Sequence, residues 1–286
     1  MVVGTRSTAK RGAFSLVALF IKRVAEGEYA IMRLSDKVVI VTGSSGGIGR
    51  ATALELAKEG ADLVLQYGLR ESEAEQVAKT VAGLGRKVVL AHVDFTNVKR
   101  AAEEVRAMVK KGVDEFGKVN ALVNLAGYPA RGEWNKRFLD LTPEDFFKPI
   151  NVDLFGTFLC AREVAPYMLK QKQGVIVNVS STPALSGHDK GFAFTVAKAG
   201  VIGLTKALAV ELAPSIRVNT IALGNVETQW VSELTPEELQ AERQGNLLKR
   251  FGKPEEIARS IVFLCSDESS FVNGQTIVLD GGSTLH

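Results

Sequence analysis

The sequence predicts one α/β domain built on a doubly wound parallel sheet. Short β-branched runs without a helical period alternate with segments whose apolar residues recur at helical spacing. A glycine-rich turn joins the first of these runs to the first helical segment, and residues 35–286 contain no internal repeat and no linker rich in Pro, Ser or Gly. Because parallel strands need crossover connections, this alternation places helices on both faces of a single sheet.

The expected elements follow one another from residue 37 onward. Strands are expected at 37–42, 62–67, 87–94, 119–127, 174–181, 216–223 and 275–282. Helices are expected at 47–60, up to about Leu84, up to about Phe116, up to about Lys170, at 195–213, and near 236–245 and 254–265. In sheets of this kind, ligands bind at the carboxyl ends of the strands.

Charge and hydropathy exclude two classes of partner. The formal net charge is +3, and residues 1–31 account for all of it, which leaves the remainder neutral. A neutral body offers no concentrated basic face for a nucleic acid. No apolar run approaches the ~20 residues needed to span a bilayer, so no membrane-spanning segment is expected.

Cysteine and histidine usage indicates neither a disulfide nor a metal site. Cys160 and Cys265 stand among apolar residues without metal-like spacing, which is typical of buried, reduced thiols and of a cytoplasmic location. The histidines His92, His188 and His286 lie far apart in the sequence, so no metal is expected.

Residues 1–33 are interpreted as an N-terminal extension, accessory or disordered, before a folded domain at 34–286. The stretch "KRGAFSLVALFIKR" has basic ends around an apolar centre. A targeting signal and an amphipathic helix that binds a partner or a membrane surface therefore stay open as alternatives.

The segment "TGSSGGIG" (42–49) predicts a nucleotide site. Gly43, Gly47 and Gly49 give the spacing G-x-x-x-G-x-G between the first strand and the first helix. Glycines there allow a tight turn and a close backbone approach, so that a pyrophosphate can rest against the helix N-terminus. The spacing differs from the G-x-G-x-x-G of the usual dinucleotide fingerprint.

Five ordered motifs over about residues 35–283 resemble the short-chain dehydrogenase/reductase family. Besides the glycine turn they are "NLAG" (124–127), "IVNVSS" (176–181) with Phe194-x-x-x-Lys198 thirteen residues after its last serine, "VNTIALGNVET" (218–228) and "GQTIVLDGG" (274–282). The chain is most similar to acyl-carrier-protein and related ketone reductases. The resemblance implies a Rossmann-like fold, a dinucleotide-binding oxidoreductase domain at 34–286, and an NAD(P)-dependent enzyme that moves a hydride between a nicotinamide and a carbonyl or alcohol.

The resemblance also assigns catalytic roles, with one departure. Ser181 matches the family's serine, which polarises the substrate oxygen, and Lys198 matches the lysine that holds the nicotinamide ribose and lowers the pKa of the family's tyrosine. Asp153 stands where the family has an asparagine of its proton relay, and a carboxylate there would keep the ammonium of Lys198 charged. Phe194 replaces the tyrosine, so the expected general acid is absent, at a cost of about 10²–10⁴-fold in rate.

Three residues are candidates for the proton donor that would replace the missing tyrosine. His188, in "SGHDKG", is preferred because imidazole titrates near neutrality. Tyr128, directly after "NLAG", is the second, and Lys198 acting through a water is the third.

For the cofactor, NADP(H) is favoured and NAD(H) is the alternative. An NAD-preferring member would place an acid at the end of the second strand, but "LQYGLRES" has Tyr67 there, Arg70 nearby and no acid before Glu71. The cofactor-binding set implied by the resemblance is Gly43, Ser45, Gly47, Ile48, Gly49, Tyr67, Arg70, Asp94, Phe95, Asn124, Ala126, Gly127, Lys198, Gly224, Val226 and Thr228.

Two function hypotheses follow. The first is an oxidoreductase that reduces a carbonyl or imine of a small-molecule substrate, or oxidises the alcohol, with an atypical catalytic set. The second is a non-catalytic dinucleotide-binding or scaffold protein. The segments 128–140 and 225–247, with Trp134 and Trp230, would give the substrate pocket an apolar lining.

The resemblance also implies a homo-oligomer, a dimer or a homotetramer. Pairing is expected through the helices at about 153–172 and 195–213. The small residues expected at this contact are Ala199, Gly200, Gly203 and Ala207.

Overall fold

The computed structural model of the chain describes residues 32–129 and 132–285. From Arg33 onward these residues form one compact unit. Of the extension predicted at 1–33, residues 1–31 lie outside the described residues, so its interpretation as an extension stays a prediction.

Seven parallel strands form one sheet in the order β3-β2-β1-β4-β5-β6-β7. The strands are β1 (Val38–Val41), β2 (Asp62–Tyr67), β3 (Val88–His92), β4 (Ala121–Asn124), β5 (Gly174–Ser181), β6 (Ile216–Leu223) and β7 (Thr276–Leu279). The order reverses between β1 and β4, the point at which doubly wound sheets bind their ligands. The fold class predicted from the sequence is confirmed.

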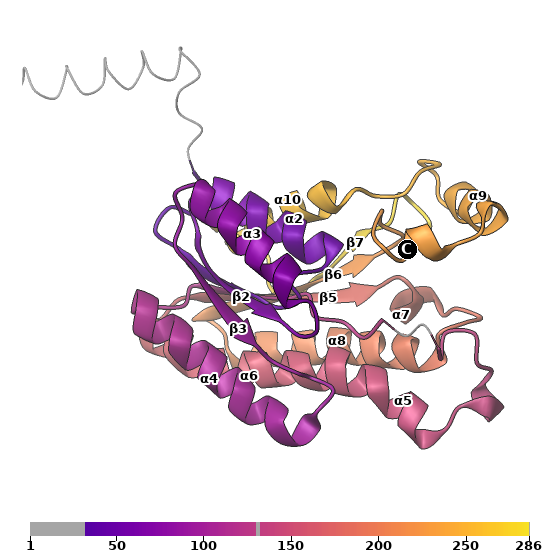
Figure 1. Cartoon of the computed structure of the whole chain (residues 1–286), viewed down its shortest axis with the longest axis horizontal. Helices are drawn as coiled ribbons and strands as arrows, with labels where there is room; N and C mark the ends of the chain where they lie inside the picture. Colours follow the sequence, from indigo (N-terminus) through magenta and orange to yellow (C-terminus); the bar gives the residue numbers. More distant parts are fainter. Residues whose placement is uncertain (1–31, 130–131, 286) are drawn as a thin grey trace, which may run out of the picture. The chain divides into compact units, whose positions relative to one another are not determined.

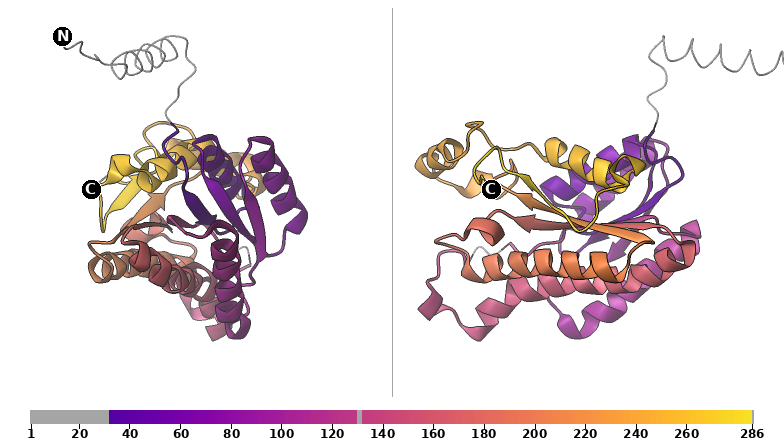
Figure 2. Two further views of the ribbon diagram at one scale, coloured as in Figure 1. Left: turned by 90° about the vertical axis from the view of Figure 1, so that its left-hand side faces the viewer. Right: turned by 180° about the vertical axis from the view of Figure 1, so that it is seen from behind.

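Helices cover both faces of the sheet (Figures 1 and 2). One face carries α2 (Gly47–Lys58), α3 (Glu71–Gly83) and α10 (Pro254–Cys265), and the other carries α4 (Val98–Phe116), α6 (Gly156–Gln171) and α8 (Phe192–Glu211). Shorter helices α5 (Pro143–Pro149), α7 (Pro183–Ser186) and α9 (Pro236–Gln244) lie in the connections. Two apolar cores result, one on each side of the sheet.

Several elements differ from the sequence expectation near the carboxyl ends of the strands; β7, for example, ends at Leu279 and not at 282. The fourth strand ends at Asn124 and not at 127, because Thr42 Oγ1 accepts hydrogen bonds from the backbone N–H groups of Leu125 and Ala126, both at 3.0 Å. The helix expected up to about Lys170 is α5 and α6 joined by a π-helical turn at Ile150–Phe155. Such turns occur often at functional sites.

Helix α8 begins at Phe192, three residues before the expected start. Gly191, the residue before it, has φ +65°, and its N–H donates to the carbonyl oxygen of Trp134 at 2.8 Å. A Cβ at Gly191 would lie 2.3 Å from the Trp134 ring. This long-range contact sets the start of the helix, which local pattern alone does not reveal.

The expectation that no apolar segment reaches membrane-spanning length was wrong for one helix. Within the described residues, α8 is long and apolar enough by length and composition, with a mean hydropathy of 1.5. Its inner side packs on β5 and β6, where Ala197, Val201 and Ala209 are buried. An apolar helix of a soluble core passes the same test, so this composition is not evidence of a membrane span.

The outer side of α8 is also rich in small and apolar residues. Ala199, Gly203 and Ala207 are exposed, and Val210 is 83% exposed. Gly200 was expected on this side, but an added Cβ there would lie 2.6 Å from the Leu154 side chain of the same chain. Gly200 therefore packs inward, and the other three residues form the exposed small-residue surface.

Both cysteines are buried free thiols, as the sequence predicted. Burial raises the pKa of the Cys265 thiol to about 12, and it raises the pKa of the Cys160 thiol as well. Neither thiol is positioned for reactivity.

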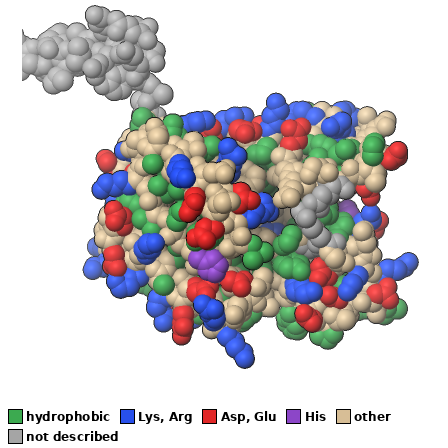
Figure 3. Space-filling view, viewed as in Figure 1, with side chains coloured by type: hydrophobic (Ala, Val, Ile, Leu, Met, Phe, Trp, Pro, Cys, Tyr) green, Lys and Arg blue, Asp and Glu red, His purple; other side chains and the backbone are tan. Residues whose placement is uncertain are grey.

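Charged residues of both signs are interspersed over the face drawn in Figure 3.

Candidate active site

The glycine turn after β1 is shaped by close contacts between backbone atoms. Gly43 has φ +64°, and an added Cβ would lie 2.9 Å from the backbone of Ala126. At Gly49 an added Cβ would lie 2.1 Å from the carbonyl oxygen of Gly43. Any side chain at either position would force the turn open, so both glycines are needed for this geometry.

The turn leaves the N-terminus of α2 free to bind an anion. Gly46 is the N-cap residue and supplies no side-chain hydrogen bond, and the first turn of α2 contains no acidic residue. The N–H groups there therefore have no side-chain cap and no repelling carboxylate. A dinucleotide's pyrophosphate fits these donors and the helix dipole.

Two polar residues that the sequence reasoning missed hold this turn in place. Gln66 Oε1 accepts from Gly43 N–H at 2.8 Å, and Gln66 Nε2 donates to the carbonyl oxygen of Val93 at 2.8 Å. Thr42 Oγ1 joins the turn to the segment after β4. Their signal in the sequence is a polar residue at the end of an otherwise apolar strand, where burial requires a hydrogen-bond partner.

Lys198 and Asp153 form a buried ion pair beside this turn. Lys198 Nζ lies 2.7 Å from Asp153 Oδ1, and the two side chains are 9% and 0% exposed. The ammonium also donates to the carbonyl oxygen of Val179 at 3.0 Å, and Asp153 Oδ2 accepts from Tyr128 N–H at 3.0 Å. The pair therefore connects α8, β5, the π-helical turn and the segment after β4.

Ser181 and Phe194 lie at the same end of the sheet. Ser181 is the last residue of β5, is half-buried, and donates from Oγ to the carbonyl oxygen of Leu223 at 3.1 Å. The Phe194 ring centroid lies 5.7 Å from Lys198 Nζ. The position therefore presents an apolar ring to the ammonium, where a hydroxyl would be expected from the sequence resemblance.

An aromatic cluster, defined here as Trp134, Phe194, Trp230 and His188, covers this end of the sheet. The Trp134 ring is central, with centroids 5.0 Å from Trp230, 5.5 Å from Phe194 and 5.6 Å from His188. The contacts to Trp230 and Phe194 are edge-to-face, the arrangement that aromatic rings prefer. The cluster brings together two segments expected to line the substrate pocket.

Comparison with known proteins agrees with this architecture. The family model described as enoyl-(acyl carrier protein) reductase matches residues 43–284. A 3-oxoacyl-[acyl-carrier-protein] reductase of Thermotoga maritima is 40% identical over 255 residues, 89% of this chain and 100% of the relative. The chain belongs to the short-chain dehydrogenase/reductase family. The family named from the sequence motifs is confirmed, and with it the oxidoreductase class.

Further members of the short-chain dehydrogenase/reductase family show how varied its relatives are. A (2S)-[(R)-hydroxy(phenyl)methyl]succinyl-CoA dehydrogenase subunit of Thauera aromatica is 38% identical over 89% of this chain and 99% of the relative. A short-chain type dehydrogenase/reductase from Mycobacterium marinum has a TM-score of 0.80 at 33% identity, covering 90% of this chain and 98% of that one. A levodione reductase has a TM-score of 0.81 at 32% identity, covering 89% and 100%.

A carboxylate contacts the side chain of Tyr67, the last residue of β2, where short-chain dehydrogenase/reductases were expected to select their cofactor. Tyr67 donates from its hydroxyl to Glu71 Oε1 at 2.5 Å, and this hydrogen bond raises the pKa of Tyr67. Glu71 is therefore held beside the strand end, closer than its sequence position indicated. Arg70 is exposed just before α3, and its guanidinium has no hydrogen-bond or ion-pair partner among the described residues.

The side chains of other predicted cofactor residues already form contacts within the protein. Asp94 Oδ1 accepts from the N–H and the hydroxyl of Thr96, so the carboxylate closes its own turn. Phe95 is buried, with its ring against Gly156. Asn124 is buried and donates to Asn178 Oδ1 at 2.9 Å. For Phe95, any cofactor contact would come from the backbone, whereas the buried Asn124 Oδ1 has no hydrogen-bond partner among the described residues.

The remaining predicted positions surround the glycine turn. Ala126 and Gly127 follow β4, with Ala126 against Gly43. Gly224, after β6, packs against Asp280, and Val226 is buried. Thr228 would lie 3.2 Å from a Cβ at Gly47, so the segment after β6 reaches over the turn. Ser45 and Ile48 are half-buried within the turn itself.

Two of the three nominated proton donors, His188 and Tyr128, differ in their surroundings. His188 is exposed, and its Nδ1 accepts from Lys190 N–H at 3.0 Å. Tyr128 donates from its hydroxyl to Glu133 Oε1 at 3.3 Å, and burial raises the pKa of Tyr128. His188 belongs to the aromatic cluster, whereas the Tyr128 ring packs against the core on the α4 and α6 side. His188 stays the preferred candidate.

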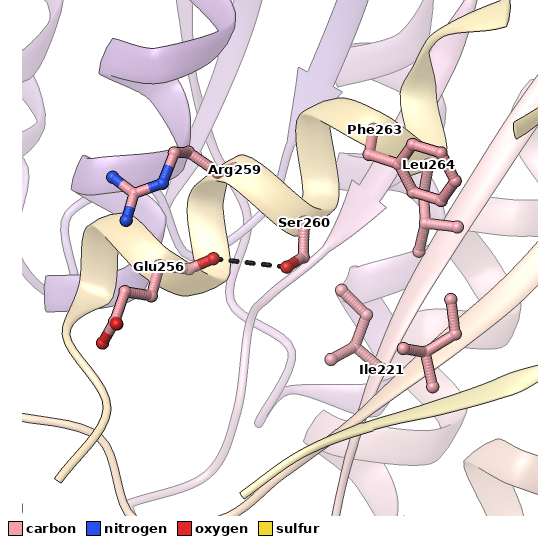
Figure 4. Close-up of a pocket in the computed structure, with 7 residues that line it drawn as sticks. Ile221, Glu256, Arg259, Ser260, Phe263 and Leu264 are labelled. Carbon is pink, nitrogen blue, oxygen red and sulfur yellow. Dashed lines mark hydrogen bonds between the residues drawn. The ribbon is translucent and has the colours of Figure 1, made fainter. Parts of the chain in front are cut away.

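A separate groove lies between α10 and the strands β6 and β7 (Figure 4). The labelled side chains include Ile221, Arg259 and Phe263. Its Ser260 hydroxyl donates to the carbonyl oxygen of Glu256 within α10, and the Glu256 carboxylate pairs with Arg250. The Ser260 hydroxyl and the Glu256 carboxylate of this groove are thus occupied internally, and none of the predicted catalytic residues lines it.

Proposed function

We propose that this chain is an oxidoreductase that reduces a carbonyl or imine of a small apolar substrate, or oxidises the corresponding alcohol, with NADP(H) favoured over NAD(H). The observation that supports it most is the juxtaposition of the glycine turn with Ser181 and the Lys198–Asp153 pair. The turn suits a pyrophosphate, and these polar groups lie at the carboxyl ends of the strands, where a nicotinamide would follow.

Each residue has a task consistent with its position. The bound cofactor would supply a hydride. Ser181 Oγ now donates to the carbonyl oxygen of Leu223, and rotation would let it donate to a substrate oxygen as negative charge develops there. Lys198 would donate to the nicotinamide ribose with the ammonium hydrogen that has no acceptor among the described residues.

Phe194 cannot provide the proton that a carbonyl product requires. The proton would come through His188 or through water held by Lys198, with Tyr128 as the less favourable donor because its hydroxyl faces Glu133. A protonated imine brings its own proton, which makes the absence of a tyrosine less costly. The imine therefore stays in the proposal beside the carbonyl.

The aromatic cluster indicates a substrate with an apolar or aryl group. Trp134, Phe194 and Trp230 are each half-buried, so parts of their rings remain accessible to a ligand. Two relatives carry names of acyl-thioester substrates, one of them with a phenyl group. We therefore propose that aryl-substituted ketones are better substrates than short hydrophilic ones.

Ser181→Ala should lower turnover by about 10²–10³-fold, the usual effect of removing one donor to a developing oxyanion. NADPH and NADH consumption is followed over a panel of aryl and alkyl ketones and cyclic imines. Stability should fall by only about 1 kcal/mol, since one hydrogen bond is lost.

Ser186→Ala, which alters an exposed serine outside the site, serves as the control and should match wild type. Unchanged turnover in Ser181→Ala would contradict the proposed mechanism. Tight dinucleotide binding with no turnover on any acceptor would instead favour the non-catalytic alternative.

Arg70→Ala should weaken NADPH binding about fivefold and leave NADH binding unchanged. Arg70 is exposed near the end of β2, and an exposed ion pair to a ribose phosphate contributes up to about 1 kcal/mol. Dissociation constants are measured by fluorescence titration at one fixed ionic strength. Tighter NADH binding in the wild type would contradict the preference, and the carboxylate of Glu71 would be its physical cause.

A homo-oligomer and a cytoplasmic location stay predictions. The exposed surface of Ala199, Gly203 and Ala207 on α8 suits close approach of a second copy. A monomeric mass in solution would contradict the oligomer. The cytoplasmic location is supported by the two reduced thiols, and recovery of the protein in a membrane fraction would contradict it.

A further inference from the structure

We propose that Asp153 neutralises Lys198, so that the lysine serves as a hydrogen-bond donor and not as a charge that would make an acid at position 194 stronger. Asp153 is thus a positioning residue, and a phenol introduced at position 194 alone would not gain the acidity that an unpaired ammonium confers. The inference rests on the proposed function for its catalytic consequence, whereas its electrostatic claim stands without turnover.

The surroundings of Asp153 show that its carboxylate is committed to the interior. Its side chain is fully buried, Oδ1 contacts the Lys198 ammonium at 2.7 Å, and Oδ2 accepts from Tyr128 N–H at 3.0 Å. A buried carboxylate persists as an ion only when it is paired and hydrogen-bonded in this way. Its place in the π-helical turn, between α5 and α6, directs it toward α8.

The surroundings of Lys198 show what its charge can act on. The ammonium has the Asp153 carboxylate as its one ion-pair partner among the described residues. The Phe194 ring lies 5.7 Å from Nζ, measured to the centroid, on the same helix. Other ionisable groups on this side are His188, which reaches Phe194 only through Trp134, and Tyr128 with its partner Glu133 beyond the Asp153 contact.

The neutralising effect follows from the distances. An unpaired ammonium within about 4–6 Å favours ionisation of a phenol and lowers its pKa by about 1–3 units. A carboxylate 2.7 Å from that ammonium opposes this effect, because a phenol at position 194 would experience both charges at once. Asparagine at position 153 would keep an oxygen acceptor for Tyr128 N–H and remove the opposing charge.

The test is a spectroscopic titration of a phenol placed at position 194. Tyrosinate absorbance is followed against pH in Phe194→Tyr and in Phe194→Tyr/Asp153→Asn, each minus its parent that retains Phe194. The phenol of the single variant should ionise near its ordinary value of about 10. In the double variant the midpoint should be lower by at least about one unit.

The matched control is Phe194→Tyr/Glu133→Gln. Glu133 is also a carboxylate next to Tyr128, but it pairs with Lys148 and not with Lys198. This control should titrate like the single variant. Circular dichroism checks that each variant is folded, and Asp153→Ser replaces Asp153→Asn if the latter is not.

Equal midpoints in the single and double variants would overturn the inference, as would a low midpoint in the single variant. If the chain reduces carbonyls as proposed, the double variant should also exceed the single one in kcat by about 10²-fold, the effect of a positioned general acid. The titration needs neither cofactor nor turnover. Failure of the proposed function would therefore leave its result unaffected.

Discussion

Gly49→Ala is expected to weaken dinucleotide binding by at least about 100-fold, equivalent to about 2.7 kcal/mol. The added Cβ would lie 2.1 Å from the carbonyl oxygen of Gly43, a distance that no side-chain adjustment can relieve, because the opposing atom belongs to the backbone. The turn must open, and the N–H groups at the start of α2 then lose their alignment for a pyrophosphate. Titration with NADPH and NADH measures the effect.

Gly46→Ala is the control for this prediction. Its added Cβ would lie 3.5 Å from the carbonyl oxygen of Gly43, an ordinary contact, and the backbone there has φ −80° and ψ 166°, which alanine adopts readily. Binding should stay within about twofold of wild type, a change of about 0.4 kcal/mol. Equal losses in both variants would show that the glycine turn is not the binding element. Unfolding curves of both variants separate a local opening of the turn from loss of the fold.

Lys198→Met should lower the free energy of unfolding by about 3–5 kcal/mol, because it leaves the buried Asp153 carboxylate without its partner. The methionine retains most of the side-chain volume, so little of this loss would come from packing. The measurement is denaturant unfolding without cofactor, which keeps ligand binding out of the comparison.

Asp153→Asn/Lys198→Met removes both charges and should regain most of that stability. A buried pair replaced as a whole is often close to neutral, while breaking it from one side is costly. The non-additivity of the two substitutions measures the interaction directly. Equal stability of the single and the double variant would mean that the cost arises elsewhere, for example from the lost hydrogen bond to the carbonyl oxygen of Val179.

The strand–helix order could be predicted from the sequence because each element repeats a local pattern. β1 and β5 are apolar runs of strand length, and α2 starts at the glycine turn as expected. The glycine positions were equally readable, since a turn with φ +64° at Gly43 requires that residue type. An element ends elsewhere than predicted where a distant residue forms the hydrogen bonds. At the end of β4, for example, Thr42 Oγ1 accepts hydrogen bonds from the next two backbone N–H groups.

The sequence predicted which residues belong to the site, but not the contacts that they form. Ser181, Asp153 and Lys198 were identified by the resemblance to short-chain dehydrogenase/reductase motifs, and the structure places Asp153 and Lys198 in direct contact. Gln66, which holds the glycine turn, was missed because a polar residue in a strand shows its partner only after the strands pair. The sequence showed no acid before Glu71, and only the structure shows that the Glu71 carboxylate accepts a hydrogen bond from the Tyr67 hydroxyl.

Local sequence therefore decides the elements, the turn and the absence of a hydroxyl at Phe194, because each of these depends on neighbouring residues along the chain. Only the folded chain decides that Trp134 covers Phe194 and that the Asp153 carboxylate meets the Lys198 ammonium. These contacts join segments separated by tens of residues. Burial then turns such a contact into a strong interaction, because charges and hydrogen bonds act most strongly where water is excluded.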